Sequence, residues 1–284
     1  MVLGPALLEH AGKGTANQAR RKTMKKLVFS FVDGDGKNKK LLGGKGANLC
    51  EMTQIGLNVP PGFVITTEAC LDYLEGDTLP EGLMAEIRDQ IAALEKTTGK
   101  TFGKGSDPLL VSVRSGSALS MPGMMDTVLN LGLNEETLAG LIEQTGDARF
   151  AYDAYRRFIQ LFGKVALGID DEHFDKHFDA IKKRVGVKAD VSLDASHLKE
   201  ISDKFLEVVR RESGEDFPHD VMQQLQLAVE AVFRSWMGKR AVDYRREFNI
   251  TPDMANGTAV NICTMVFGNK GNDCATGVGF TRNP

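Results

Sequence analysis

The chain has 284 residues, 42% of them hydrophobic and 26% charged, which is the composition of an ordinary folded protein with one large domain or two smaller ones. It contains no run of 18 apolar residues, so the sequence excludes a transmembrane helix and predicts no membrane partner. The net charge is −3, and the first 26 residues hold six Lys or Arg against one Glu, so the remainder is acidic and no nucleic-acid partner is expected.

Residues 1–23 differ in composition from the rest of the chain. They are poor in acidic residues and lack both sustained apolar periodicity and the apolar core of a secretory signal. Three interpretations compete: a disordered leader, an artefact of an upstream start site or of the expressed sequence, and a transit peptide. We favour the first two, because the segment is short of serine for a transit peptide. A cytoplasmic location is expected, with an organelle left open if the source is a eukaryote.

The segment before residue 135 reads as alternating strands and helices. The expected strands are 27–32, 63–67 and 109–113. The expected helices lie within 41–55, 68–74 and 81–96. Gly56 has the position of a C-terminal helix glycine, and a turn is expected at 33–36.

Between residues 135 and 218 the pattern is helical, with a thick apolar stripe on one face. Asp194 is expected to be the N-cap of the last helix in this stretch. After a break, a long helix starts at His219 and continues to Trp236 or, after an interruption, to Phe248. His173 and His177 have a metal-capable spacing but no evident third ligand, so a solvated polar face is favoured.

The last stretch returns to β structure. Strands over 259–267 and 275–282 predict a hairpin, across which Cys263 and Cys274 would face each other. Because two strands alone make a marginal sheet and the second ends near Pro284, we expect this chain to be the front part of a longer protein. The four cysteines form no CxxC pair, so reduced thiols are expected, with neither a zinc site nor a disulfide framework.

Lys45 lies in a Gly-Gly-Lys-Gly motif, residues 43–46, at the start of a predicted helix. Glycine lets the backbone approach a ligand, and a helix N-terminus with a lysine favours an anion. The spacing is not that of a Walker A loop, and taken alone the motif favours a surface turn. A second element suited to phosphate in the same chain favours the functional interpretation.

The stretch 111–131 carries that second element. The strand at 109–113 leads into Arg114, and the following run of Gly, Ser and Met contains no charge before Asp126. An arginine fork, serine hydroxyls and open backbone N–H groups suit a polyphosphate. The candidate donors besides Arg114 are Ser115, Gly116, Ser117, Ser120 and Gly123.

Alternatives remain for several of these residues. Arg114 could instead pair with a structural carboxylate at a sheet edge. The loop methionines Met121, Met124 and Met125 suit either a planar base or gaps in the core. The pairs Arg156-Arg157 and Arg245-Arg246 are expected to form surface salt bridges.

Six blocks in collinear order resemble the pyruvate, phosphate dikinase family over about residues 24–284. They are LLGGKGANLCEM, VPPGFVITTEAC, SVRSGSALSMPGMMDTVLNLGL, FAYDAYRRFIQLFG, VFRSW, and NICTMVFGNKG with GVGFTRNP. Related phosphoenolpyruvate synthases share the GGKG, PPGF and VRS elements. Their arginine loop typically has early acidic residues, which VRSGSALSMPGMMDT lacks.

This resemblance implies an α+β fold, namely an ATP-grasp-like nucleotide-binding domain with an inserted helical subdomain. The expected divisions are 24–134 as the first subdomain, 135–218 as the helical insert, 219–256 as a helical return, and 257–284 as an incomplete second subdomain. Lys45 and Arg114 correspond to the ATP-contacting and phosphate-contacting residues and are the implied catalytic pair. A loop that folds over the nucleotide is implied to add Ser115, Gly116, Ser117, Gly123, Met124, Met125, Asp126 and Thr127.

The resemblance also implies a reaction. The family interconverts ATP, phosphate and pyruvate with AMP, pyrophosphate and phosphoenolpyruvate, using Mg²⁺, a monovalent cation and a phosphohistidine on a separate domain. The full enzyme is expected to be a homo-oligomer. This chain shows no match to the carrier-histidine motif, and its metal ligands are expected beyond Pro284, so the polypeptide alone is expected to be inactive. A phosphoenolpyruvate synthase-type dikinase, or a nucleotide-binding module without catalysis, is the alternative.

Overall fold

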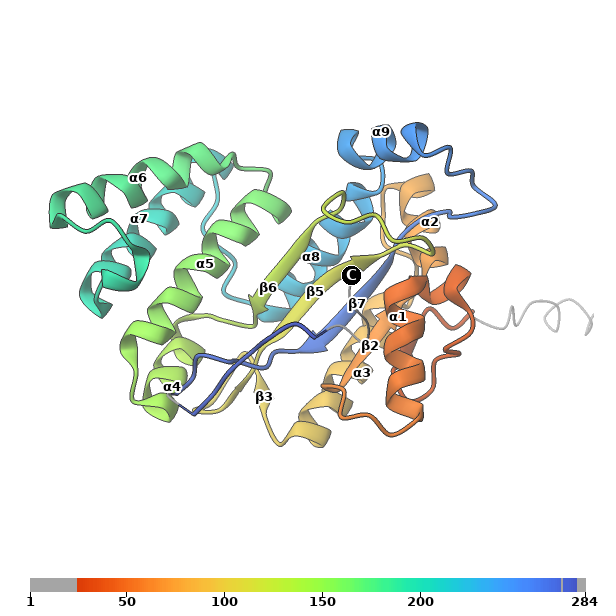
Figure 1. Ribbon diagram of the computed structural model, residues 1–284, viewed down its shortest axis with the longest axis horizontal. Coiled ribbons are helices and arrows are strands. Elements are labelled where there is room, and N and C mark those ends of the chain that lie inside the picture. The colour runs from red at the N-terminus through yellow and green to blue at the C-terminus, as the bar shows by residue number, and fades with distance from the viewer. Residues whose placement is uncertain (1–24, 272, 280–284) are drawn as a thin grey trace, which may run out of the picture.

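The structure is a computed structural model that describes residues 25–271 and 273–279, so the predicted leader at 1–23 lies outside the described residues. It combines a mainly antiparallel sheet with many helices, which confirms the expected α+β class (Figure 1). No helix in the described part is long and apolar enough to cross a membrane.

Five strands form the main sheet in the order β1-β2-β7-β5-β6, with every neighbouring pair antiparallel. They are β1 (Val28–Ser30), β2 (Gly62–Ile65), β5 (Val111–Gly116), β6 (Thr127–Leu131) and β7 (Ala259–Thr264). A separate parallel pair consists of β3 (Thr101–Phe102) and β4 (Pro108–Leu109). The strands expected at 27–32, 63–67 and 109–113 are thus found, with bounds shifted by a few residues.

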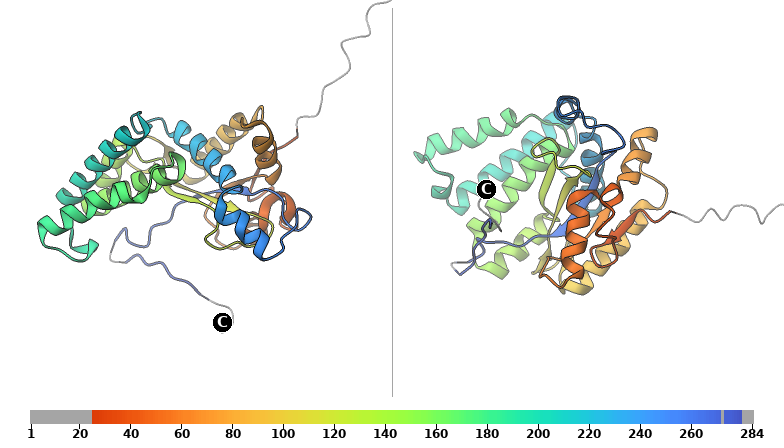
Figure 2. Two further views of the ribbon diagram at one scale, coloured as in Figure 1. Left: turned by 90° about the horizontal axis from the view of Figure 1, so that it is seen from above. Right: turned by 45° about the vertical axis from the view of Figure 1, so that its right-hand side comes forward.

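Helices lie to either side of the sheet (Figures 1 and 2). Those of the first half are α1 (Lys39–Gln54), α2 (Thr67–Gly76) and α3 (Leu83–Thr98). Those of the helical stretch are α4 (Glu135–Thr145), α5 (Ala148–Ala166), α6 (Asp171–Val185), a 3₁₀ turn η1 (Asp190–Ser192) and α7 (Ala195–Ser213). The return consists of α8 (Val221–Ser235) and α9 (Lys239–Glu247), so the long helix from His219 is interrupted, as one of the two expectations allowed.

Short polar side chains begin most of these helices. The expected N-cap, Asp194, accepts a hydrogen bond from the backbone N–H of His197. Asn134 and Thr137 form a reciprocal capping box at the start of α4. Such caps satisfy backbone donors that a helix leaves free at its N-terminus, and they fix where each helix begins.

The predicted C-terminal hairpin is wrong. β7 pairs with β2 on one side and with β5 on the other, so both of its edges are occupied along the strand. Residues 265–271 and 273–279 form no strand, and positions 280–282 lie outside the described residues. The central position of β7 is explained by Val260 and Ile262, whose side chains are fully buried there. A two-stranded hairpin would leave them in contact with water. β7 therefore belongs to the sheet built by the first half of the chain, while the subdomain divisions themselves stay a prediction.

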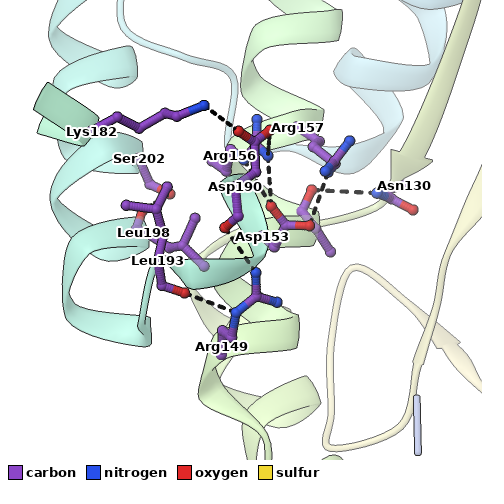
Figure 3. Close-up of polar contacts among 11 residues, drawn as sticks. Asn130, Arg149, Asp153, Arg156, Arg157, Lys182, Asp190, Leu193, Leu198 and Ser202 are labelled. Carbon is purple, nitrogen blue, oxygen red and sulfur yellow. Dashed lines mark hydrogen bonds and ion pairs between the residues drawn. The ribbon is translucent and has the colours of Figure 1, made fainter. Parts of the chain in front are cut away.

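Helices α5, α6 and α7 form a group beside the β6 edge (Figure 1), and a polar cluster links α5 to α6 through η1 (Figure 3). Arg156 is only 5% exposed, and its Nη2 lies 2.8 Å from Asp153 Oδ1. Asp190 accepts a 2.6 Å hydrogen bond from Lys182 Nζ and lies 3.7 Å from Arg156 Nη2. The expectation of a surface salt bridge is therefore wrong for Arg156, because Asp190 of η1 and the ring of Phe178 on α6 lie against its guanidinium.

Candidate functional site

The Gly-Gly-Lys-Gly motif interrupts α1. Gly43 has φ 68° and ψ 163° inside the helix, a conformation that only glycine adopts readily, so a second helical part starts just after it. Lys45 consequently lies in the first turn of this second part, where backbone N–H groups favour an anion. Lys45 therefore lies at a helix start, as expected, but this start follows a break inside α1.

The two elements that suggested phosphate binding lie in contact. A Cβ atom on Gly43 would come within 1.9 Å of the Gly116 carbonyl oxygen. The Gly44 N–H donates to the Ser117 carbonyl at 2.8 Å, and Lys45 Nζ donates to the Ser115 carbonyl at 3.2 Å. The helix start and the end of β5 therefore form one continuous site.

Lys45 and Arg114 bring two positive charges to this site. The pKa of Lys45 is lowered, first by partial desolvation within the protein and second by the nearby positive charge of Arg114. Across the described part of the chain, neither side chain forms a salt bridge. The alternative in which Arg114 pairs with a structural carboxylate is therefore wrong. Two like charges held close together without a counter-charge favour the binding of an anion.

A cleft of about 570 Å³ opens between α1 and the loop that joins β5 to β6. Among the predicted residues, its lining includes Lys45, Ser115, Gly116, Ser117, Ser120, Gly123, Met125 and Thr127. The other lining residues were not predicted from the sequence as site residues, except that contact with a planar base was one of two interpretations of Met121. They are Lys39, Gly44, Asn48, Ala118, Leu119, Met121 and Pro122. Asn48 could have been found, because position i+3 from Lys45 shares its helix face.

Three predicted residues do not line the cleft. Arg114 lies within β5 and not in the loop, since that strand continues to Gly116. Its side chain is exposed, and its positive charge lowers the pKa of Lys45 in addition to desolvation. Asp126 Oδ1 instead accepts a 2.9 Å hydrogen bond from Arg240 Nη2 on α9. Met124 is half-buried against the core.

Arg240 also donates to the Gly123 carbonyl at 3.3 Å, so one side chain holds two points of the loop. The Ser117 hydroxyl donates to the Leu119 carbonyl and is therefore engaged inside the loop. Met121 is 6% exposed and packs in the core, and it also contributes to the lining of the cleft. The loop is thus anchored at several positions.

Residues 39–84 and 76–284 match the profile of a family described as pyruvate phosphate dikinase, AMP/ATP-binding domain. The chain belongs to the pyruvate, phosphate dikinase family. It is 58% identical over 258 residues to a pyruvate, phosphate dikinase of Entamoeba histolytica and 51% identical over 263 residues to that of Clostridium symbiosum. A chloroplastic pyruvate, phosphate dikinase of Mesembryanthemum crystallinum is 53% identical over 264 residues.

These alignments cover 90%, 92% and 91% of this chain but only 29%, 30% and 28% of the three dikinases. The chain therefore spans less than a third of the length of these relatives. The part that it shares with the dikinase family is the AMP/ATP-binding domain, and this part includes both Lys45 and Arg114.

In this dikinase domain, β7 and the residue before it form hydrogen bonds with the end of β5 that belongs to the site. The Gly116 N–H donates to Thr258 Oγ1 at 3.1 Å, just before β7 begins. Asn261 Nδ2 donates to the Arg114 carbonyl at 3.3 Å. Neither residue could be assigned to the site from the sequence, because β7 reaches the site only through sheet pairing.

The described residues offer no cluster of metal ligands at this site. Within residues 25–271 and 273–279, no group of three or more His, Cys, Asp or Glu side chains is placed to hold a metal ion. His173 lies on α6 with its Nδ1 3.2 Å from Glu212, far in the chain from the cleft residues. The four cysteines are free thiols, and burial raises the pKa of Cys50 to about 11 and that of Cys70 to about 12. None of these residues lines the cleft.

Proposed function

We propose that the chain binds ATP in the cleft between α1 and the β5–β6 loop. The polyphosphate is held by Lys45, which lines the cleft, and by Arg114, whose neighbour in the sheet, Thr127, lines it. The observation that carries this proposal is a pair of cations with no salt-bridge partner among the described residues. The pKa of Lys45 is lowered first by desolvation and second by the charge of Arg114. A polyphosphate would remove their mutual repulsion and gain charge-assisted hydrogen bonds from both. The start of the second helical part of α1 adds backbone donors.

The loop supplies the other wall. Ser115, Gly116 and Thr127 contribute polar groups near the phosphates, while Met125 and Pro122 offer apolar surface suited to a base or sugar. Gly123, with φ 72°, allows the loop to turn back over the cleft. We assign Met124 and Asp126 to shaping the loop, since one packs inward and the other binds Arg240.

At the level of fold, we infer an ATP-grasp-like domain in which α4 to α7 form an inserted helical subdomain. At the level of reaction, the chain would serve an enzyme that interconverts ATP, phosphate and pyruvate with AMP, pyrophosphate and phosphoenolpyruvate. The resemblance implies this reaction, and the relatives are named pyruvate, phosphate dikinase. The phosphohistidine carrier, the pyruvate site, the homo-oligomer and the cytoplasmic location belong to this proposal.

Mg²⁺ would accompany the nucleotide and needs carboxylate ligands. The described residues do not form a metal-binding group, and Asp126 is engaged by Arg240. Because Mg²⁺ is usually held by one or two carboxylates together with substrate phosphates, we place its protein ligands outside the residues described here. The cleft would receive the ion together with the nucleotide.

Calorimetric titration with MgATP tests the proposal. We expect the double variant Lys45→Ala/Arg114→Ala to lose measurable binding, because each charged hydrogen bond contributes roughly 1.5–3 kcal/mol. The control is Lys199→Ala/Arg210→Ala on α7, which removes the same charges from two exposed ion pairs. An unchanged Kd in the first double variant would contradict the assignment of the site.

A further inference from the structure

Asn261 is a fully buried amide at the centre of the sheet. Its exposed fraction is 0%, and it lies on β7 between Val64 of β2 and Arg114 of β5. Its neighbours along the strand, Val260 and Ile262, are apolar. Burying an amide costs free energy unless its polar atoms are hydrogen-bonded, so a polar side chain here calls for an explanation.

The hydrogen bonding of this amide is incomplete. Asn261 Nδ2 donates to the Arg114 carbonyl at 3.3 Å, whereas Oδ1 is buried without a hydrogen-bond partner among the described residues. An unsatisfied buried acceptor typically costs about 1–3 kcal/mol. A role in stability alone would favour an apolar residue at this position.

The amide is enclosed by both elements of the site. A Cβ atom on Gly46 would lie 2.8 Å from Asn261 Oδ1, and one on Gly116 would lie 2.7 Å from Nδ2. Gly46 follows Lys45 directly, and Gly116 is two residues after Arg114. The Asn261 side chain therefore contacts the backbone next to each of the two cations.

We propose that Asn261 is a positioning residue, whose amide holds the Arg114 backbone against α1 so that Arg114 and Lys45 can grip the same polyphosphate. This inference rests on the proposed function. Asn261 does not line the cleft and acts through Arg114. The glycines at 46 and 116 serve the same arrangement, because any side chain there would displace the amide.

The test is a double-mutant cycle on MgATP affinity in the full 284-residue chain. We expect Asn261→Ala to raise the Kd about tenfold, as the loss of one hydrogen bond to a critical backbone group implies. In an Arg114→Ala background the same substitution should change the Kd less than twofold, because the residue through which it acts is gone. A purely structural role would give the same loss in both backgrounds.

Thr264→Val is the matched control. It removes another side-chain hydrogen bond from β7, the 2.9 Å bond to the Pro61 carbonyl, at the end of the strand away from Gly116. We expect it to lower Tm without changing the Kd. Asn261→Val, a substitution suited to a buried strand, serves in the same cycle if the alanine variant does not fold.

The outcomes separate this inference from the proposed function. If Arg114→Ala weakens MgATP binding while Asn261→Ala leaves it unchanged, only the positioning role is overturned. A loss that persists in full in the Arg114→Ala background also overturns it. If neither Arg114→Ala nor the Lys45→Ala/Arg114→Ala variant changes the Kd, the proposed function itself fails.

Discussion

Gly43 and Gly116 are in backbone contact, and the approach is so close that a Cβ atom on Gly43 would lie 1.9 Å from the Gly116 carbonyl oxygen. This contact joins the interrupted helix α1 to the end of β5. It brings Lys45 beside the Ser115 carbonyl and within the field of Arg114. The geometry of the cleft therefore depends on the absence of a side chain at position 43.

Substitution of Gly43 tests this dependence. Gly43→Ala should lower the free energy of unfolding clearly more than Gly56→Ala and should also weaken MgATP binding. Gly56 has φ 85° with no atom within 4 Å of an added Cβ, so its substitution reports the conformational cost alone, about 1–2 kcal/mol. Urea unfolding and calorimetry of both variants make the comparison. Equal effects of the two substitutions on stability and binding would refute the role of the contact.

The affinity for ATP should decrease as pH rises, and the decrease should begin at a lower pH than the pKa of an ordinary lysine would give. The pKa of Lys45 is lowered by desolvation and then by Arg114, so the ammonium loses its proton, and its attraction for phosphate, as pH rises through this lowered pKa. In Arg114→Gln the midpoint of the decrease should move to higher pH, because one cause is removed. Calorimetry between pH 8 and the alkaline limit of folding measures both midpoints; coincident midpoints would argue against the coupling.

The bond between Asp126 and Arg240 should restrain the loop with little effect on stability. Arg240 is 62% exposed, and exposed ion pairs contribute at most about 1 kcal/mol. Arg240→Ala should therefore leave Tm nearly unchanged but increase amide hydrogen exchange over residues 117–126. Lys239→Ala, which removes the neighbouring ion pair to Asp243, is the control. Unaltered exchange in Arg240→Ala would show that the loop is held by other contacts.

Breaking the pair between Arg156 and Asp153 should cost more stability than breaking an exposed ion pair of the same group of helices (Figure 3). Asp153→Ala leaves the guanidinium of Arg156, which is 5% exposed, without its nearest carboxylate, and breaking a buried ion pair costs roughly 3–5 kcal/mol. Asp203→Ala, which removes an exposed pair with Lys199, should change the free energy of unfolding much less. Chemical denaturation of the two variants decides, and equal costs would contradict the argument.

The purified 284-residue chain should form no phosphoenolpyruvate from ATP, phosphate and pyruvate. It corresponds to the AMP/ATP-binding domain and spans less than a third of the length of its relatives. Phosphoryl transfer also depends on a metal held in position, and the described residues form no such metal group. A coupled assay with excess enzyme checks this, and steady turnover would disprove it.

Much of the fold could be predicted from local sequence signals. The apolar periodicities of α3 and α5, the N-cap at Asp194 and the β-branched strand β2 each depend on residues close in the chain. The partner of β7 could not be predicted in this way. A β-rich stretch followed by a glycine turn fits a hairpin. In the structure β7 instead pairs with the edges of both β2 and β5, which buries more apolar surface than a two-stranded hairpin would.

For the site, the sequence by itself determined the chemistry: a lysine among glycines, an arginine after a buried strand, and a loop of serines and glycines that together suit a polyphosphate. Only the tertiary structure decided that these elements form one cleft, that Asp126 binds Arg240, and that Asn261 contacts the backbone beside both cations. The reason is physical. Residue type fixes which groups can bind an anion, whereas their distances depend on sheet pairing and backbone contacts between segments far apart in the chain.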